Sequence, residues 1–315
     1  MKNDYHLIAK ICRMYYLDDL SQNEIADNLR ISKSAVSRLL KEGRKRGIIT
    51  FHIKEPGDRW SSLEEKLERA FKLKEAVVVS DEGIDSAEII KKKVAKAAAL
   101  LLQRRVREKD IVAVSWGTTL AEVAKALNPS FHLNIEVVPL VGGIDDKGRD
   151  IHSNEIARRI SEAFGGRYYI LNAPVIVNNP VVKKALEKEE SIKTVIEKGK
   201  SADIAVVGIG IPKPNSTMVK RGYFSAKEFA ELAEKGAVGD ICTNFYDIQG
   251  NICEFSLDNK RIGLGLKELK LIPNVIGVAS GEEKVDAILG ALRGRYINML
   301  VTNKRVAEYL VKMQV

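Results

Sequence analysis

Beyond Lys74, short apolar runs rich in β-branched residues alternate with longer stretches of helical periodicity. The apolar runs cover residues 76–80, 111–114, 136–140, 168–171, 204–207, 275–279 and 298–301, and the helical stretches include 87–103, 153–163 and 282–292. Apolar strands separated by helices are typical of a parallel sheet that helices cover on both faces. The sequence therefore predicts an α/β, Rossmann-like domain for most of the chain.

A different pattern precedes this domain. Apolar residues recur at helical spacing over residues 5–16 and predict a first helix. Ser21 and Glu24 then form a capping-box pattern, in which the serine hydroxyl accepts from the Glu24 backbone amide and the Glu24 carboxylate reaches back to the first residue. A short second helix over residues 22–29 follows from this start signal.

A tight turn at Arg30 and Ile31 separates the second helix from a third. Ser32 is a suitable N-cap, and the third helix is expected over residues 33–46, with Gly47 ending it. Arg30 occupies a turn position that often carries glycine, so it either adopts a left-handed conformation or the turn is built differently. Two short helices joined in this way, after a supporting helix, predict an all-α helix-turn-helix domain.

Positive charge is concentrated in the same segment. Residues 1–54 carry 11 Lys/Arg against 6 Asp/Glu, and residues 30–47 alone carry 7 against 1, within a chain of formal net charge +9. Such a basic segment is expected where DNA phosphates are neutralised. One face of the third helix is expected to read base edges, and its end to contact phosphates. The DNA-binding residues are then Lys33, Ser34, Ser37, Arg38 and Lys41 for the first role, Arg44, Lys45 and Arg46 for the second, and Ser32 at the start of the helix.

A boundary between two domains is expected after the helix-turn-helix. Residues 48–53 alternate apolar side chains and predict a strand, or wing, which residues 55–58 break. A helical linker over residues 60–71 follows, and its seam of apolar residues fits either a dimer contact or packing on its own domain. The expected division is residues 1–55 for DNA binding, 56–74 for the linker helix and 75–315 for the effector domain.

In parallel α/β sheets, ligands bind in the turns that follow the strands. Gly117, Thr118 and Thr119 follow one strand and open a helix, so hydroxyls and helix N-terminal amides are available to an anion. Gly142 and Gly143 follow another strand, and a third glycine-rich turn covers residues 208–210. Three such turns in one domain predict a phosphate-sized pocket.

Two charged residues near such turns are further ligand candidates. Asp240 suits sugar hydroxyls, and Lys284, in the first turn of a helix, suits a phosphate that the helix dipole already favours. The three cysteines have no CxxC spacing, so they predict neither a disulfide framework nor a metal site, and no cofactor is expected. No apolar run reaches the roughly 20 residues of a membrane span, so we expect a cytoplasmic protein without membrane contact.

The order of these motifs resembles the sorbose-operon (SorC-type) family of transcriptional regulators over nearly the full length. The segments that carry the resemblance are residues 20–26 (LSQNEIA), 36–40 (VSRLL), 115–118 (SWGT), 206–210 (VVGIG), 236–241 (GAVGDI) and 287–302 (AILGALRGRYINMLVT). The resemblance implies an effector domain like ribose-5-phosphate isomerase and glucosamine-6-phosphate deaminase, sugar-phosphate binding, and assembly as a homodimer or homotetramer on double-stranded operator DNA. The pocket positions it implies are Gly117, Thr118, Gly142, Gly143, Asn154, Asp240 and Lys284.

One departure from the family pattern concerns covalent binding of the effector. Some relatives place a lysine before the double glycine, where it would form a Schiff base with an aldehyde, and Val141 occupies that position here. Covalent capture is therefore not expected.

Three functions follow as hypotheses. The favoured one is a DNA-binding regulator of a carbohydrate or polyol catabolic operon, whose operator binding responds to a phosphorylated sugar or polyol and which has no catalytic residues. The second is a sugar-phosphate isomerase or deaminase with an appended DNA-binding domain, which needs a carboxylate or histidine base; of four scattered histidines only His152 lies near a candidate turn. The third is an assembly module that binds DNA without an effector.

Overall fold

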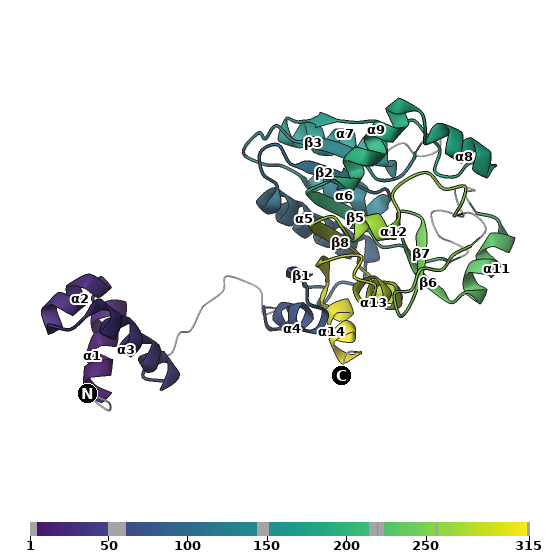
Figure 1. Cartoon of the computed structure of the whole chain (residues 1–315). Helices are drawn as coiled ribbons and strands as arrows, with labels where there is room; N and C mark the ends of the chain where they lie inside the picture. Colours follow the sequence, from purple (N-terminus) through teal and green to yellow (C-terminus); the bar gives the residue numbers. More distant parts are fainter. Residues whose placement is uncertain are drawn as a thin grey trace. The chain divides into compact units, whose positions relative to one another are not determined.

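The computed structural model describes residues 5–49, 61–143, 151–213, 219, 224–255 and 258–313. The chain divides into two compact units, Met1–Gly57 and Asp58–Val315, which Figure 1 draws with their helices and strands labelled. Each unit has its own hydrophobic core, so each is described separately.

The first unit consists of three helices, α1 (Tyr5–Tyr16), α2 (Gln22–Leu29) and α3 (Lys33–Lys45). Ser21 and Glu24 form the expected capping box, with hydrogen bonds of 3.3 Å and 2.8 Å between side chain and backbone in the two directions. Arg30 ends α2 in the left-handed region at φ 50°, which settles the question about this turn. The helix-turn-helix prediction is confirmed. Its core contains Ile8, Ile11, Cys12, Ile25, Ala26, Val36 and Leu40.

The expected wing lies almost entirely outside the described residues. Residues 48 and 49 form a bend, and residues 50–60 are not described. The expected break at residues 55–58 and Trp60, the first residue of the expected linker helix, therefore also lie outside the described residues.

The second unit contains a parallel sheet of seven strands in the order β1-β9-β8-β5-β2-β3-β4. The strands are β1 (Glu75–Val79), β2 (Ile111–Val114), β3 (Glu136–Pro139), β4 (Arg167–Tyr168), β5 (Ile204–Gly208), β8 (Asn274–Val278) and β9 (Met299–Asn303). Each coincides with one of the seven expected apolar runs to within a few residues, and the α/β prediction is confirmed.

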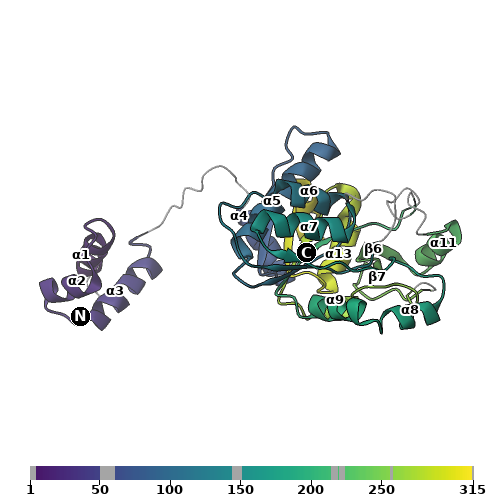
Figure 2. The same cartoon turned by 90° about the horizontal axis from the view of Figure 1, so that it is seen from above.

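Helices cover both faces of this sheet. The described helices of the second unit are α4 (Ser61–Phe71), α5 (Ala87–Arg105), α6 (Thr118–Ala126), α7 (Ser153–Phe164), α8 (Pro180–Leu186), α9 (Glu190–Lys200), α11 (Ala226–Glu234), α12 (Leu266–Leu269), the 3-10 turn η2 (Glu282–Lys284), α13 (Val285–Arg293) and α14 (Lys304–Lys312). Figure 2 shows α5, α6 and α7 together on one side. Alternate residues of a strand point to opposite faces, so Ile204 and Val206 of β5 join the core under these helices, while Ala205 and Val207 join the core with α12, α13 and α14.

The helix α4 packs on its own domain. Leu67 is fully buried in the core that also holds residues of β1 and α14, and Leu63 and Phe71 pack against it. Of the two alternatives for the apolar seam of this segment, the structure therefore shows packing within the unit.

A small antiparallel hairpin was not expected from the sequence. It consists of β6 (Ala237–Ile241) and β7 (Asn244–Asp247) and lies outside the main sheet.

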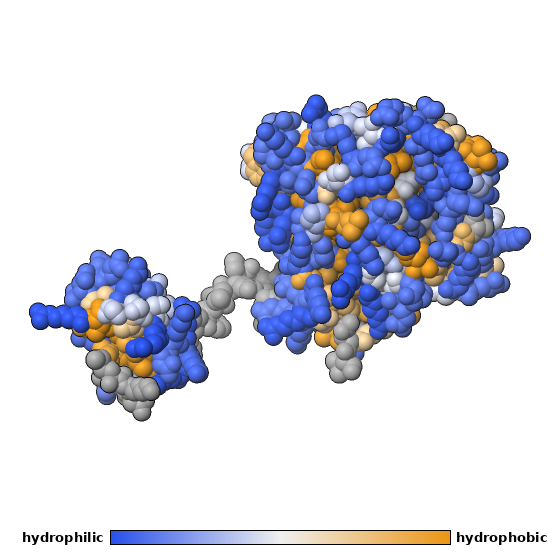
Figure 3. Space-filling view, viewed as in Figure 1, coloured by the Kyte–Doolittle hydropathy of each residue, from blue (hydrophilic) through white to orange (hydrophobic). Residues whose placement is uncertain are grey.

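On the face in view in Figure 3, hydrophilic residues cover most of each unit and hydrophobic residues form separate patches. None of the helices within the described residues is long and apolar enough to span a bilayer.

Candidate functional site

The exposed face of α3 carries the residues expected to bind DNA. Val36, Leu40 and Gly43 are buried against the rest of the unit, whereas Lys33, Ser34, Arg38, Lys41 and Lys45 are exposed and Ser37 is half-buried. At 100° per residue Ser34, Arg38, Lys41 and Lys45 fall on the side opposite the buried set, whereas Lys33, in the first turn, lies only about 60° from Val36. Ser32 caps α3 by accepting from the Ala35 amide at 3.2 Å.

Two of the basic residues at the end of α3 have partners within the first unit. Arg44 donates to the Tyr16 hydroxyl from Nε at 2.9 Å and from Nη2 at 2.6 Å, and its guanidinium lies over the Tyr16 ring. Arg46 pairs with Glu42 at 2.6 Å, and the Arg46 side chain holds the pKa of Glu42 below its usual range. These contacts orient both guanidinium groups on the surface of the unit while leaving them exposed.

A cavity of about 370 Å³ lies where the order of the parallel strands reverses. From β2 the chain continues outward to β3 and β4 on one side, and later strands add β5, β8 and β9 on the other. Ligands of open α/β sheets bind at such a point, at the carboxyl ends of the strands. The residues that line the cavity are Ser115, Trp116, Gly117, Thr118, Thr119, Gly208, Ile209, Gly210, Ile211, Lys213, Asp240, Cys242, Glu283 and Lys284.

Asp240 is buried in this cavity, at 6% exposed, and Lys284 is half-buried beside it. Burial raises the pKa of Asp240 to about 7, although Lys284 and the Thr243 backbone amide oppose the rise. Burial lowers the pKa of Lys284, and the nearby Asp240 carboxylate opposes that fall. Lys284 also donates to the Ile209 carbonyl at 2.8 Å. The cavity therefore contains an acid and an amine whose charges partly compensate each other where both are shielded from solvent.

The hairpin turn that follows Asp240 has an unusual backbone. Cys242 and Thr243 both have positive φ, at 52° and 62°, and neither is a glycine. Strained positions of this kind persist where the surroundings hold them, and they cluster at binding sites. Here Asn244 holds the turn, because its Nδ2 donates to the carbonyls of Ile241, Cys242 and Leu264 at 3.0–3.1 Å. Burial raises the pKa of the Cys242 thiol to about 12, so it is a neutral part of the wall.

The structure brings five of the eight sequence-predicted effector residues to this cavity. They are Gly117, Thr118, Thr119, Asp240 and Lys284. Gly142, Gly143 and Asn154 are not among the lining residues. Asn154 accepts from the Leu171 amide at 3.0 Å and donates to the carbonyls of Gly143 and Leu171 at 3.5 Å and 3.4 Å, so its amide is occupied by backbone groups.

Four lining residues were not singled out from the sequence. Ile211 and Lys213 follow β5, Cys242 follows β6 and Glu283 follows β8. Lys213 and Glu283 were detectable in principle, because each lies a few residues after an expected strand. Cys242 was not, because its strand had not been recognised.

Two residues bear on the alternatives weighed from the sequence. Val141, in the position of the Schiff-base lysine of some relatives, is fully buried and bridges to Gly263. His152 is 5% exposed, precedes α7 and does not line the cavity. Neither supplies a nucleophile or a base to this site.

Comparison with known proteins matches both units. A sugar-binding domain family matches residues 57–312, and region 4 of sigma-70 matches residues 9–46. The deoxyribonucleoside regulator of Bacillus subtilis is 37% identical, with 97% of each chain covered. The sorbitol operon regulator of Klebsiella pneumoniae is 34% identical, with 98% of this chain and 99% of the relative covered. The crystal structure of that full-length regulator, SorC, superimposes on this chain with a TM-score of 0.75 at 33% identity. The superposition covers 99% of this chain and 100% of the SorC chain.

Proposed function

The chain belongs to the SorC-type family of transcriptional regulators with a sugar-binding domain, and from this membership we propose that it controls a carbohydrate or polyol catabolic operon in response to a phosphorylated sugar or polyol. Its relatives over the full length are transcriptional regulators and not isomerases or deaminases. A regulator of this kind acts in the cytoplasm, where its operator lies.

The observation that supports an effector site is the meeting of Asp240 and Lys284 in one cavity beside the first turn of α6. A phosphate is stabilised where helix N-terminal amides converge with a cation. Thr118 opens α6, Lys284 lies in the cavity wall and Lys213 adds a second cation. The Asp240 carboxylate would then accept hydrogen bonds from sugar hydroxyls. This division of roles fits a polyhydroxylated phosphate ester.

The test uses the full-length protein and a panel of pentose, hexose and polyol phosphates, each matched with its unphosphorylated counterpart. We expect one or more phosphorylated members to raise the Tm and the matched unphosphorylated compounds to have little effect. Lys284→Met should abolish the shift, whereas Lys188→Met, which removes an exposed lysine away from the cavity, should keep it. Equal shifts with phosphorylated and unphosphorylated compounds would refute the phosphate assignment.

For the DNA-binding half we propose that α3 enters the major groove, with Lys33, Ser34, Ser37, Arg38 and Lys41 facing base edges. Arg44, Lys45 and Arg46 would contact phosphates. Because such contacts release counterions, affinity for the DNA upstream of the gene should fall steeply as salt rises. Affinity that does not depend on salt would contradict this assignment.

A homodimer or homotetramer is part of the proposal, because two recognition helices on half-sites one turn of DNA apart bind far more selectively than one. Effector binding changes operator affinity only if the effector binds the two states of the assembly unequally. The measurement is operator affinity with and without the active compound, and the expected change is roughly 5- to 150-fold. Light scattering of the free protein and of its DNA complex determines the number of chains.

A further inference from the structure

The helix α4 covers the free edge of the sheet through two carboxylates. β1 is an end strand, paired with β9 on one side only, and its outward amides therefore need other acceptors. Glu64 accepts from the Val78 amide at 2.7 Å, and Glu68 accepts from the Ala76 amide at 2.9 Å. These two bonds and buried Leu67 tie the first described helix after the DNA-binding unit to the sheet.

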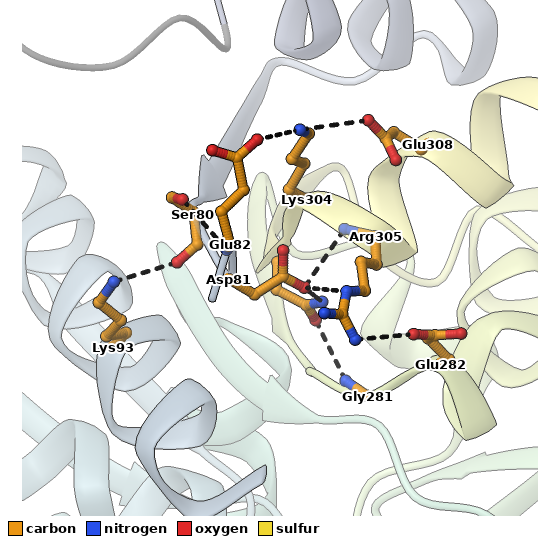
Figure 4. Close-up of polar contacts among 10 residues, drawn as sticks. Ser80, Asp81, Glu82, Lys93, Gly281, Glu282, Lys304, Arg305 and Glu308 are labelled. Atoms are coloured by element: carbon orange, nitrogen blue, oxygen red, sulfur yellow. Dashed lines mark hydrogen bonds and ion pairs between the residues drawn. The ribbon is translucent and has the colours of Figure 1, made fainter. Parts of the chain in front are cut away.

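The strand β1 leads directly to a buried carboxylate. Asp81 is 1% exposed, and its Oδ2 accepts from the Asn303 Nδ2. The same oxygen accepts from the Arg305 amide at 3.4 Å, a contact that Figure 4 draws. Its other oxygen, Oδ1, has no hydrogen-bond partner among the described residues. Unpaired buried acceptors are uncommon and call for an explanation.

Asn303 connects this carboxylate to the wall of the cavity. It ends β9, precedes α14 and is 2% exposed. Its Oδ1 accepts from the Gly281 amide at 3.1 Å, and Gly281 begins the turn that carries Glu283 and Lys284 into the cavity. Figure 4 also shows Arg305 reaching Glu282 of the same turn, at 3.5 Å.

The helix α14 completes the connection, because Val306 and Leu310 share a core with Leu67 of α4. The Asn303 side chain thus contacts two segments: the turn that carries Lys284, through Gly281, and Asp81, two residues after the end of β1. We infer that Asn303 is a positioning residue for the effector cavity and that the chain of contacts from Gly281 through Asn303 and Asp81 couples the cavity to α4. This inference rests on the proposed function, since it gives the route by which an effector would act on the segment leading to the DNA-binding unit.

The sequence offers a matched control on the same strand segment. Asn298 precedes β9 at its opposite end, where its Oδ1 accepts from the Val275 amide at 2.8 Å and its Nδ2 donates to the Pro273 carbonyl at 2.8 Å. Asn298→Ala, like Asn303→Ala, therefore removes one accepted and one donated side-chain hydrogen bond, but away from the cavity.

The experiment is hydrogen exchange on the full chain, followed by mass spectrometry in peptides covering residues 61–80 and 279–285. Without ligand, we expect Asn303→Ala to speed exchange in both peptides by at least about tenfold, and Asn298→Ala to leave both unchanged. With inorganic phosphate as probe, the wild type should gain protection in both peptides, and Asn303→Ala only in residues 279–285. If Asn303→Ala does not fold, Asp81→Asn, which keeps the size of the side chain, is measured in the same way.

Two results would overturn the inference. One is ligand-free exchange over residues 61–80 that is the same in Asn303→Ala and wild type. The other is phosphate-induced protection of residues 61–80 that survives in Asn303→Ala. Failure of phosphate to protect residues 279–285 in the wild type counts against the phosphate cavity instead, and the ligand-free comparison still decides whether Asn303 couples the two segments.

Discussion

Gly210 and Asp240 pair with each other through two backbone hydrogen bonds, of 2.9 Å from the Gly210 amide and 3.1 Å from the Asp240 amide. This single antiparallel bridge attaches the β6–β7 hairpin to the end of β5. It also places the Asp240 carboxylate against Gly210, at a position where any side chain would displace it. The position of the Asp240 carboxylate in the cavity therefore requires a glycine at residue 210, which is 30 residues earlier in the chain.

Gly210→Ala is expected to remove effector binding while leaving the fold intact. A Cβ at this position would lie 2.0 Å from Asp240 Oδ1, so the carboxylate must move out of place. We expect the affinity for the active compound, measured by calorimetry, to fall by at least about tenfold, equivalent to about 1.4 kcal/mol. Gly199→Ala in α9, whose Cβ would make an ordinary contact at 3.6 Å, is the control. Wild-type affinity in Gly210→Ala would show that the position of Asp240 does not matter.

Asp240→Asn should change the pH dependence of stability. Because burial raises the pKa of Asp240 to about 7, the ionised carboxylate destabilises the folded protein above pH 7. That cost is relieved as the pH falls from about 7 toward the unfolded value near 4. The Asn variant should therefore be more stable than wild type at pH 8, by on the order of 2–4 kcal/mol, and the difference should shrink by pH 5. Denaturant unfolding at the two pH values measures it, and a difference that grows on acidification would contradict the assignment.

Gly142→Ala is expected to lower the free energy of unfolding, because Gly142 is a close-packed position and not a ligand contact. Its Cβ would lie 2.4 Å from the Pro174 carbonyl oxygen and 2.6 Å from that of Ala173, and backbone atoms cannot give way easily. We expect a loss of about 1–3 kcal/mol, the usual cost of overpacking. Gly143→Ala, whose nearest contact would be the Ser153 hydroxyl at 3.2 Å, should cost less. If Gly142→Ala kept the wild-type Tm but lost effector binding, Gly142 would be a ligand contact after all.

Arg38→Ala and Lys45→Ala should weaken DNA binding in different ways. Arg38 lies at mid-helix on the exposed face of α3, so its loss should reduce preference for the operator over unrelated DNA by about 1–3 kcal/mol. Lys45, at the end of the helix, should affect all sequences alike and reduce the salt slope by about one. Binding of both variants to operator and scrambled duplexes over a salt series distinguishes these outcomes. Identical losses on both duplexes for Arg38→Ala would refute a base-reading role.

The helix-turn-helix was predictable almost residue by residue because its signals are local. A capping box joins residues three apart, and apolar residues three or four apart define each buried face. The parallel strands were predictable for a related reason, since strands buried on both faces are apolar throughout. The hairpin β6–β7 carries no such signal: its turn residues, Cys242 and Thr243, are not those that usually adopt positive φ.

The effector cavity was only partly predictable. Gly117, Thr118 and Lys284 could be placed near it because strand ends meet at one edge of a parallel sheet. Asn154 could not be distinguished from a ligand contact in the sequence, because an amide that binds backbone carbonyls and one that binds sugar hydroxyls have the same chemistry. Only the Leu171 and Gly143 backbone groups around it show how its side chain is used.

The sequence by itself determined the two-part architecture, the three helices of the DNA-binding unit, the exposed basic face of α3 and the parallel sheet. Each of these depends on periodicity and on contacts between near neighbours. Tertiary structure alone decided that Asp240 faces Lys284, that α4 covers β1 and that Asn303 joins Gly281 to Asp81. Those pairs are separated by up to 222 residues, and their partners are chosen by the order of the strands, which no local pattern of residues specifies.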